Sequence, residues 1–545
     1  MKTIMAALVW STLGWRAMAA APGPIEISSG WALRDAATVS ATGEGISRSA
    51  FQATGWYPAT VPGTVLTTLV NHAIYPEPLY GENNRPDKIP ESLCRSAYWY
   101  RATITVPASY AGRKVWLNFE GINYAAEVWV NGTNLGQIQG AFTRGVFDVT
   151  PAVKAGEVAS LAVRVSPPPN PGNPHEQTLT HGVGPNGGIS AMDGPTFLCS
   201  MGWDWIPGIR DRNTGIWQKV FLSASGPVLV QEPLVTADLS LPKLDSAAIR
   251  IQATLKNVSD QAQKGLLKGT FGGIPFQLAV ALDAHSTKVV SLDPATTPRL
   301  RLKNPKLWWP NGYGPQNLYP VRLAFEIGGA VSDTASLTTG IRKITYTVPE
   351  SDNLTLSVNG VRVMCKGGNW GMDEAMKRIP RARLEAQIRM HQQANYTIIR
   401  NWVGQSTSED FYDLCDQYGI LLWDEFFQPN PGDGPNPKDL AIYLANCREK
   451  IVRFRNHPSI AIWCGRNEGR PPENINNGLQ QLMTELEPTR LYQPSSTDGR
   501  GVKSGGPYRW RTPREFYGVD APFKTEIGSV SVPTLEAVQA MMLSF

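Results

Sequence analysis

The sequence lacks the cysteine and histidine patterns that bind metals or stabilise small secreted folds. Its six cysteines include no CxxC pair and do not have the spacing of a disulfide framework. Cys365, Cys415 and Cys464 lie within apolar segments, so we expect buried free thiols there. The six histidines form no HxH or HExxH cluster, which argues against a metal site. We therefore expect the protein to need neither a metal nor another cofactor.

Long apolar runs and clustered positive charge are also missing. No stretch reaches the roughly 20 apolar residues that a membrane-spanning helix needs. The formal net charge is only +5, and lysine and arginine are not gathered into runs. Neither a nucleic acid nor an anionic membrane is therefore the expected partner, and a neutral substrate fits the charge better.

The N-terminus has the pattern of an export signal. Lys2 supplies a basic start, residues 4–13 are largely apolar, and Ala17-Met18-Ala19 offers small residues for cleavage. We expect residues 1–21 to be a signal peptide. The protein is then exported, to the periplasm or to the extracellular space.

The first part of the remaining chain has the pattern of a β-sandwich. In residues 22–225, short alternating segments such as Trp99–Val106 and Ala126–Val130 are broken by turn residues. The second of these segments is followed by Asn-Gly, a strong signal for a hairpin turn. Leu161–Val165 and Ile216–Leu222 are further predicted strands.

A second β-rich unit follows, over residues 226–343. Its predicted strands include Ala248–Leu255 and Tyr319–Ile327, and its size suits an immunoglobulin-like β-sandwich. Trp308–Gly312 predicts a rigid turn between two of its strands.

Beyond residue 343, predicted strands alternate with predicted helices. The strands are Val361–Cys365, Tyr396–Arg400, Ile420–Trp423, Ile460–Cys464 and Leu491–Pro494. The helices are Arg381–Ala394, Ser408–Gln417, Leu440–Phe454, Pro472–Leu486 and Leu535–Met542. This alternation predicts a parallel sheet closed as a (β/α)8-type TIM barrel over residues 344–545. The predicted barrel is incomplete at its C-terminus: a sixth strand near Tyr508–Trp510 is faint, and no eighth strand is found.

Acidic residues follow several of the predicted barrel strands. Glu468 comes just after Ile460–Cys464, and Glu526 follows the short apolar stretch at Phe523. Barrels present catalytic groups at the carboxyl ends of their strands, and glycoside hydrolysis needs two carboxyl groups. Asp424 and Glu425 end a third strand, and for them we favour a structural role in bonding neighbouring loops.

Three segments together resemble glycoside hydrolase family 2. They are Gly121–Gly132 in the first sandwich, Gly340–Lys343 at the entrance to the barrel, and Arg453–Glu468 around the candidate acid. The resemblance covers nearly the whole chain, in order. It implies a jelly-roll domain for the first sandwich, and a retaining glycosidase with Glu468 as acid/base and Glu526 as nucleophile.

Within that family the sequence is most similar to the β-mannosidase branch. Gly202–Trp205, Ile209–Trp217 and Gly506–Tyr508 resemble segments of mannosylglycoprotein endo-β-mannosidases. The resemblance implies that Asp204 and Trp205 reach into the barrel mouth and hold the sugar. The alternative is that the tryptophans of this segment pack one domain against another.

The resemblance also implies further contacts with the carbohydrate substrate. Asn467 is expected to bond the sugar 2-hydroxyl, and Arg400 to bond the nucleophile. Trp402 is expected to stack on a sugar face, and Tyr508 to contact the substrate. Asn369 and Trp370 are weaker candidates for the same mouth. A retaining mechanism predicts carboxyl groups about 5–5.5 Å apart, against roughly 6.5–9.5 Å for an inverting one.

Two other functions remain open at this point. An exo-β-glucosaminidase has the same three-domain layout, and Asp204 is a candidate for meeting a substrate amine. A truncated, non-catalytic sugar-binding protein would use the first sandwich as a lectin-like module. The sequence leaves open the linkage, endo or exo action, and the oligomeric state.

Overall fold

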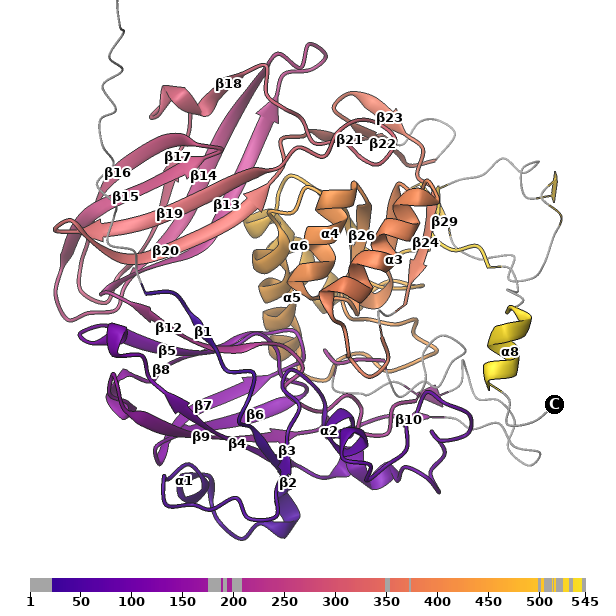
Figure 1. Cartoon of the computed structure of the whole chain (residues 1–545). Helices are drawn as coiled ribbons and strands as arrows, with labels where there is room; N and C mark the ends of the chain where they lie inside the picture. Colours follow the sequence, from indigo (N-terminus) through magenta and orange to yellow (C-terminus); the bar gives the residue numbers. More distant parts are fainter. Residues whose placement is uncertain are drawn as a thin grey trace, which may run out of the picture.

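Three structural units follow one another in the computed structural model (Figure 1). The structure describes residues 22–174, 188–189, 194–198, 208–347, 353–371, 374–497, 501–503, 512, 514–515, 523–528 and 533–541. Within these ranges, no helix is both long and apolar enough to cross a bilayer. Two antiparallel β-sandwiches precede a unit of parallel strands and helices, as expected from the sequence.

The first unit is a sandwich of a six-stranded and a four-stranded sheet. The strand orders are β3-β2-β4-β9-β6-β7 and β1-β12-β5-β8. Its elements are β1 (Ile25–Glu26), β2 (Ala32–Asp35), α1 (Gly43–Ile46), β3 (Tyr57–Pro58), α2 (Val65–Asn71), β4 (Tyr98–Thr105), β5 (Lys114–Phe119), β6 (Ala125–Val130), β7 (Thr133–Gln139), β8 (Gly145–Asp148), β9 (Val158–Ser166), β10 (Asn173–Pro174), β11 (Gly188–Ile189) and β12 (Val220–Ser225).

The turn between β6 and β7 is the one that Asn-Gly predicts. Asn131 and Gly132 have φ angles of 49° and 87°, and the two strands pair directly on either side of them. Positive φ at both central residues gives a hairpin turn whose twist matches the strands. The predicted strand Ile216–Leu222 is correct only at its end, because β12 begins at Val220. Ile216 and Trp217 are buried, so their apolar pattern reflects burial in a loop.

The second unit is an immunoglobulin-like sandwich around its own apolar core. One sheet has the order β13-β14-β17, with β18 also on β14, and the other has the order β16-β15-β19-β20. The strands are β13 (Val228–Leu239), β14 (Ser246–Asn257), β15 (Gln263–Phe271), β16 (Ile274–Leu282), β17 (Thr287–Leu292), β18 (Arg301–Lys303), β19 (Tyr319–Ile327) and β20 (Ala330–Thr339).

In the third unit, five parallel strands lie in the order β24-β25-β26-β27-β28. Helices lie beside this sheet in Figure 1. The elements are β21 (Ile344–Thr347), β22 (Thr355–Val358), β23 (Val361–Val363), β24 (Gly367–Trp370), α3 (Arg381–Gln393), β25 (Ile398–Asn401), α4 (Glu409–Tyr418), β26 (Leu421–Glu425), α5 (Leu440–Phe454), β27 (Ile460–Cys464), α6 (Glu473–Leu486), β28 (Leu491–Gln493), β29 (Val502–Lys503), β30 (Phe523–Lys524) and α8 (Leu535–Met541).

The first barrel strand is not where the sequence predicts it. Val361–Cys365 was expected to start the parallel sheet, but β23 pairs antiparallel with β22 in a hairpin. The first parallel strand is β24, which pairs with β25. β24 begins with Gly367 and Gly368, and glycines have no side chains to give the alternation that marks a strand. Asn369 and Trp370 therefore lie within this strand and do not follow it.

The remaining barrel strands are short. β29 pairs in parallel with β30, and each is two residues long. The sixth strand therefore lies at Val502–Lys503, whereas Tyr508–Trp510 lies outside the described residues. Seven parallel strands are present in the described part of the chain, and within it no strand pairs with the second edge of β24.

Cysteine environments agree with the sequence except at one position. Cys415 and Cys464 are buried free thiols, as expected. Cys365 is also free but only half-buried, because it borders a large cavity. Cys199 lies outside the described residues.

The third unit is joined to the second sandwich through Asn456. Its Nδ2 donates to Pro233 O, and its Oδ1 accepts from Val235 N, both at 2.8 Å. Its backbone oxygen accepts from Thr339 Oγ1 at 2.8 Å. The predicted turn Trp308–Gly312 contributes as well, since Trp308 Nε1 donates to a backbone oxygen of α4.

The third unit also shares one apolar cluster with the first sandwich. Phe142 of the sandwich stacks on Phe427 of the loop after β26, with ring centroids 3.8 Å apart. Arg453 of α5 forms an ion pair with Glu120 at 2.5 Å. The loops after the barrel strands are thereby held against the sandwich.

Candidate active site

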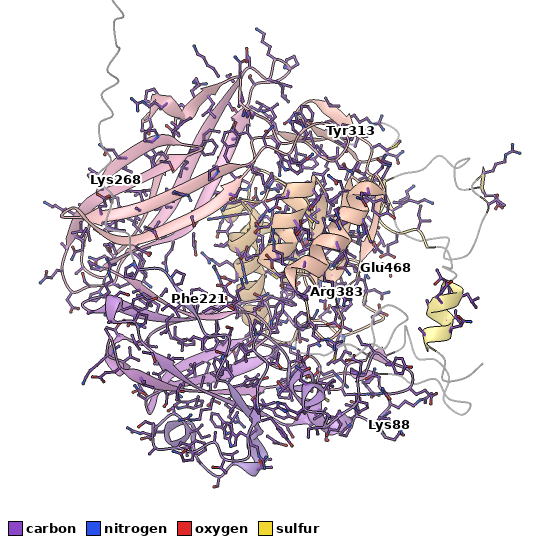
Figure 2. All side chains as sticks on the ribbon, viewed as in Figure 1. Lys88, Phe221, Lys268, Tyr313, Arg383 and Glu468 are labelled. Atoms are coloured by element: carbon purple, nitrogen blue, oxygen red, sulfur yellow. The ribbon has the colours of Figure 1, made fainter. Side chains whose placement is uncertain are left out.

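Parallel strands bring Glu468 and Glu526 to the same place. Glu526 follows β30 after one residue, and Glu468 lies in the loop beyond the carboxyl end of β27. Parallel barrel strands end at one face, so the loops that follow them meet there. The two carboxyl groups lie close enough to share a hydrogen bond. Figure 2 labels Glu468 at the right-hand edge of the third unit.

Arg400, near the end of β25, connects the candidate residues. Its Nε donates to Glu425 Oε1 at 2.6 Å, and its Nη2 donates to Asn467 Oδ1 at 2.6 Å. Its Nη1 forms an ion pair with Glu526. Burial alone would lower the pKa of Arg400, but the Glu425 and Glu526 carboxylates raise it above its ordinary value. A permanent positive charge therefore lies against Glu526, and the contact expected between these two residues is present.

The Glu468 carboxyl group is half-buried and is held by neighbouring loops. Asn430 Nδ2 donates to its Oε2 at 2.8 Å, and the Glu468 N–H donates to Ser496 Oγ at 2.9 Å. Its φ of 41° lies in the left-handed region, where strained non-glycine residues cluster at functional sites.

The electrostatic surroundings of Glu468 favour its protonated form. Burial raises the pKa of Glu468, and the charge of Glu526 raises it further. The hydrogen bond from Asn430 lowers the pKa and only partly offsets these effects. A carboxyl group that keeps its proton beside a second carboxyl group can act as a general acid.

Asn467 is the third candidate residue at this point. It is 3% exposed, and its backbone N–H donates to Gln428 O at 3.1 Å. Its amide oxygen accepts from Arg400, so Asn467 is fixed beside both Arg400 and Glu468. Bonding of Asn467 to a sugar hydroxyl stays a prediction.

The other candidates from the sequence are placed differently. Trp402 is 1% exposed in a 3-10 turn, Trp402–Gly404, so its stacking on a sugar stays a prediction. Trp370 is buried too, and its Nε1 donates to Ser406 Oγ at 2.9 Å. Asn369 lines the same cavity as Glu526. The remaining candidates lie outside the described residues: Asp204, Trp205 and Tyr508.

The sequence did not distinguish the roles of Asp424 and Glu425, which both ranked behind Glu468 and Glu526 as candidates. Asp424 accepts from Lys450 Nζ at 2.7 Å and Tyr412 OH at 2.8 Å, which is the structural role expected for it. Glu425 instead bonds Arg400, and so belongs to the network of the candidate site. Adjacent residues of a strand point to opposite sides, but sequence alone does not say which side holds the site.

Asn430 was missed altogether by sequence reasoning. It lies in the loop after β26, between two prolines, Pro429 and Pro431. Such a composition indicates a turn and gives no sign of a contact with a residue of another loop. The only available signal is its position after a barrel strand end.

One cluster in the described residues has metal-ligand chemistry. Ligand atoms of Asp413, Asp416 and His457 all lie within 4.8 Å of one another. Asp416 is already engaged, since its Oδ2 lies 2.7 Å from His457 Nδ1 and its Oδ1 accepts from Ser459 N at 2.9 Å. These contacts give the cluster a structural explanation, because they hold α4 to the turn before β27.

Comparison with known families accounts for this arrangement. Residues 31–218 match the glycosyl hydrolase 2 galactose-binding domain-like model, and residues 229–342 match the glycosyl hydrolases family 2 model. Residues 351–503 match the family 2 TIM barrel domain. The chain belongs to glycoside hydrolase family 2. The third match contains Arg400 and Glu468 and ends before Glu526.

Two curated relatives of this family 2 chain are similar along most of its length. It is 33% identical to the mannosylglycoprotein endo-beta-mannosidase of Lilium longiflorum, over 89% of the chain and 56% of the relative. It is 31% identical to the exo-beta-D-glucosaminidase of Streptomyces avermitilis, over 96% of the chain and 58% of the relative. The chain thus spans a little over half the length of these relatives.

Two solved glycosidase structures have the same fold. The exo-chitosanase of Amycolatopsis orientalis, in a complex with PNP-beta-D-glucosamine, superposes with a TM-score of 0.82 at 25% identity. That match covers 96% of this chain and 60% of the other. The beta-D-mannosidase of Dictyoglomus thermophilum has a TM-score of 0.72 at 22% identity, over 96% of this chain and 65% of the other.

Proposed function

We propose that the chain is a retaining glycoside hydrolase that cleaves β-mannosidic bonds in glycans or oligosaccharides. One observation carries the proposal: Glu468 and Glu526 lie close enough to share a hydrogen bond at the carboxyl ends of two parallel strands. Such closeness agrees better with the short carboxyl separation of retaining enzymes than with the roughly 6.5–9.5 Å of inverting ones, so it supports direct attack on the sugar.

In the proposed reaction, the Glu526 carboxylate attacks the anomeric carbon. Glu468 gives its proton to the glycosidic oxygen as the bond to the leaving group breaks, and an ester forms between Glu526 and the sugar. Glu468, now a carboxylate, takes a proton from water as that water attacks the anomeric carbon. The second displacement releases the sugar with its original configuration and returns both residues to their starting states.

The charge of Arg400 and the surroundings of Glu468 support these two roles. Arg400 places its positive charge against Glu526, which suits a nucleophile that must be ionised. Burial and the charge of Glu526 raise the pKa of Glu468, which suits an acid. The different surroundings of the two carboxyl groups therefore match their proposed functions.

The sugar specificity rests on similarity to named relatives. The lily relative is a mannosylglycoprotein endo-beta-mannosidase, which favours a β-mannoside as substrate. A second candidate is an exo-β-glucosaminidase, favoured by the Streptomyces relative and by the superposition on the exo-chitosanase. Hydrolysis rates for matched aryl β-mannoside and aryl β-glucosaminide substrates test this choice. Faster cleavage of the glucosaminide would favour the second candidate function, an exo-β-glucosaminidase.

Glu468→Gln and Glu526→Gln test the roles of the two residues. We expect each variant to lose about 10²–10⁴-fold or more in kcat, because each removes an essential proton transfer or bond. Glu473→Gln, an exposed glutamate at the start of α6, is the matched control and should keep full activity. Unchanged hydrolysis in Glu468→Gln would refute the assignment, and an inactive but sugar-binding wild-type chain would support a lectin-like function.

The configuration of the first product tests the retaining mechanism separately. A proton NMR spectrum recorded early in the reaction should show the β-anomer of the released sugar before it equilibrates. Initial release of the α-anomer would instead mean inversion, which requires a water between the carboxyl groups.

A further inference from the structure

The loop that carries Asn430 has few backbone donors. Residues 428–437 (the Asn430 loop) lie shortly after β26 and include four prolines: Pro429, Pro431, Pro435 and Pro437. Proline fixes the chain direction but has no N–H group to donate. Two of the N–H groups that remain, at Gly432 and Asp433, donate to Asn430 within the loop itself. The loop therefore has few backbone groups with which to bind neighbouring segments.

The start of the Asn430 loop lies against the segment that contains Glu468. Asn430 Nδ2 donates to Glu468 Oε2 at 2.8 Å. The Pro431 ring packs on the residue after Glu468, because a Cβ at Gly469 would lie only 3.1 Å from the Pro431 Cγ. A shift of the loop would therefore change the surroundings of the Glu468 carboxyl group.

Arg466, two residues before Glu468, holds both ends of the Asn430 loop. Its Nε donates to Pro429 O near the start of the loop, and its Nη1 donates to Asn436 Oδ1 near the end, both at 2.8 Å. A guanidinium group is planar and presents its N–H donors in a fixed fork. One rigid side chain thus sets the separation of the two ends of the loop.

The charge of Arg466 is held at a cost. The residue is 2% exposed, and within the described part of the chain it forms no ion pair. Its acceptors are uncharged oxygen atoms, and burial lowers its pKa. A buried charge without a counter-charge destabilises a fold unless hydrogen bonds compensate. The contribution of Arg466 therefore lies in its donors, and two of them bind the Asn430 loop.

We propose that Arg466 is a positioning residue for the acid step: it keeps the Asn430 loop in place, so that Asn430 stays bonded to Glu468. The assignment rests on the proposed role of Glu468 as the general acid. Arg466 donates to the loop and not to Glu468, so it acts through Asn430. The shape of a proline-rich loop thereby becomes part of the control of the acid.

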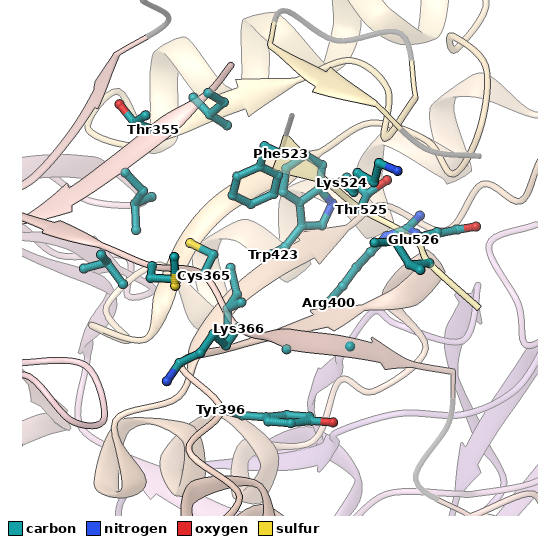
Figure 3. A pocket seen from close by; sticks show the side chains of 18 of the residues that line it. Thr355, Cys365, Lys366, Tyr396, Arg400, Trp423, Phe523, Lys524, Thr525 and Glu526 are labelled. Atoms are coloured by element: carbon teal, nitrogen blue, oxygen red, sulfur yellow. The ribbon is translucent and has the colours of Figure 1, made fainter. Parts of the chain in front are cut away.

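Two charged groups from other strands also act on Glu468. The Glu526 carboxylate raises the pKa of Glu468, and the Arg400 guanidinium lowers it. Figure 3 shows these two side chains next to each other, where they form an ion pair. Removal of the charge at Arg466 could add an electrostatic effect of the same kind. Variants that leave every charge in place therefore separate positioning from charge.

Asn436→Ala and Arg466→Lys meet this condition. Asn436 is exposed, so loss of its side chain leaves the core intact, and a lysine ammonium group cannot reproduce the fork that binds both acceptors. In each variant the alkaline limb of the kcat/KM profile for an aryl β-mannoside should move to higher pH, because a displaced Asn430 lowers the pKa of Glu468 less. Hydrogen exchange of amides in the Asn430 loop should become about tenfold or more faster.

A double variant tests whether Arg466 acts through Asn430. The alkaline limb of Asn430→Ala/Asn436→Ala should coincide with that of Asn430→Ala alone, because no Asn430 hydrogen bond to Glu468 is left to weaken. Substitutions that act through one shared contact are not additive. A purely structural role for Arg466 would instead give independent, additive effects.

Arg490→Lys is the matched control for Arg466→Lys. Arg490 is also a buried arginine that donates to backbone oxygens, but it binds the start of β27, at His457 O and Ile460 O. This variant should lose stability and leave the alkaline limb unchanged. Asn474→Ala, at an exposed asparagine on α6, is the control for Asn436→Ala and should change neither quantity.

Three results would overturn the proposal. They are an unmoved limb in Asn436→Ala or Arg466→Lys, a further shift of the limb in the double variant, and an equal shift in Arg490→Lys. A wild-type chain that hydrolyses no glycoside would instead refute the proposed function. The pKa of Glu468 can then be followed without a substrate, by carboxyl carbon NMR with the signal identified by its absence in Glu468→Gln. It should rise in the same two variants.

Discussion

Asn430 donates a hydrogen bond to Glu468 Oε2 at 2.8 Å, so the loop after β26 holds the carboxyl group that follows β27. The contact stabilises the carboxylate and lowers the pKa of Glu468, whereas burial and the charge of Glu526 raise it. A general acid must be protonated when it meets its substrate. Asn430 therefore lowers the upper pH limit of the proposed acid step.

Asn430→Ala should move the alkaline limb of the pH–rate profile to higher pH. The substitution removes an interaction that lowers the pKa of Glu468, so Glu468 stays protonated over a wider range. The profile of kcat/KM with an aryl β-mannoside is the measurement. Asn474→Ala, at an exposed asparagine on α6, should leave the limb unchanged. A shift of the limb to lower pH would contradict the role given to Asn430.

Glu425→Gln should lower kcat by about 10²-fold with little change in KM, because small displacements of catalytic groups are costly. Glu425 accepts from Arg400 Nε, Val403 N and Trp423 Nε1, and thereby fixes the position of Arg400. Loss of its charge would loosen the contact of Arg400 with Glu526. Steady-state kinetics on the folded variant give the two parameters.

Asp424→Asn is the matched control for Glu425, on the same strand and equally buried. Asp424 bonds Lys450 and not Arg400, so this variant should lose stability and keep most of its kcat. If the two variants lost kcat equally, Glu425 would have no specific positioning role.

Arg400→Met should destabilise the fold by about 3–5 kcal/mol, since it leaves a buried carboxylate without its partner. The free energy of unfolding in urea, monitored by tryptophan fluorescence, measures the change. Lys343→Met breaks the solvent-exposed pair with Asp238 and should cost less than about 1 kcal/mol. An equal loss of unfolding free energy in the two variants would mean that the buried ion pairs of Arg400 do not stabilise the fold more than an exposed pair does.

The export signal proposed for residues 1–21 predicts a shortened mature protein. Expression in a host with a secretion pathway should place the protein outside the cytoplasm, with an N-terminus close to residue 22. N-terminal sequencing of the exported protein is the measurement. Substitution of a charged residue for Leu8 in the apolar segment should retain the full-length protein inside the cell.

Much of the third unit could be predicted because its helices and strands carry complete patterns. α5 and β27 have the predicted bounds, Leu440–Phe454 and Ile460–Cys464. Each combines a continuous pattern of buried side chains with clear flanking turns, which is where periodicity is most reliable. β24 was missed for the opposite reason, since half of it is glycine.

The candidate site could be predicted only in part. Glu468 and Glu526 each follow an apolar strand, so their positions could be recognised from local sequence. The hydrogen bond of Asn430 and the choice of Glu425 over Asp424 depend on which loops meet in space. Contacts between side chains of different loops produce no periodic pattern in the sequence.

Asn456 makes the second sandwich an integral part of the catalytic unit. The hydrogen bonds that it forms with Pro233, Val235 and Thr339 fasten the sandwich to the segment leading into β27. A fragment starting at residue 344 would expose the polar groups of Asn456 to solvent. It would also lose the anchor of the segment before β27, the strand that Glu468 follows. A fusion protein that uses the third unit should therefore begin at or before residue 226, so that it contains the second sandwich as well.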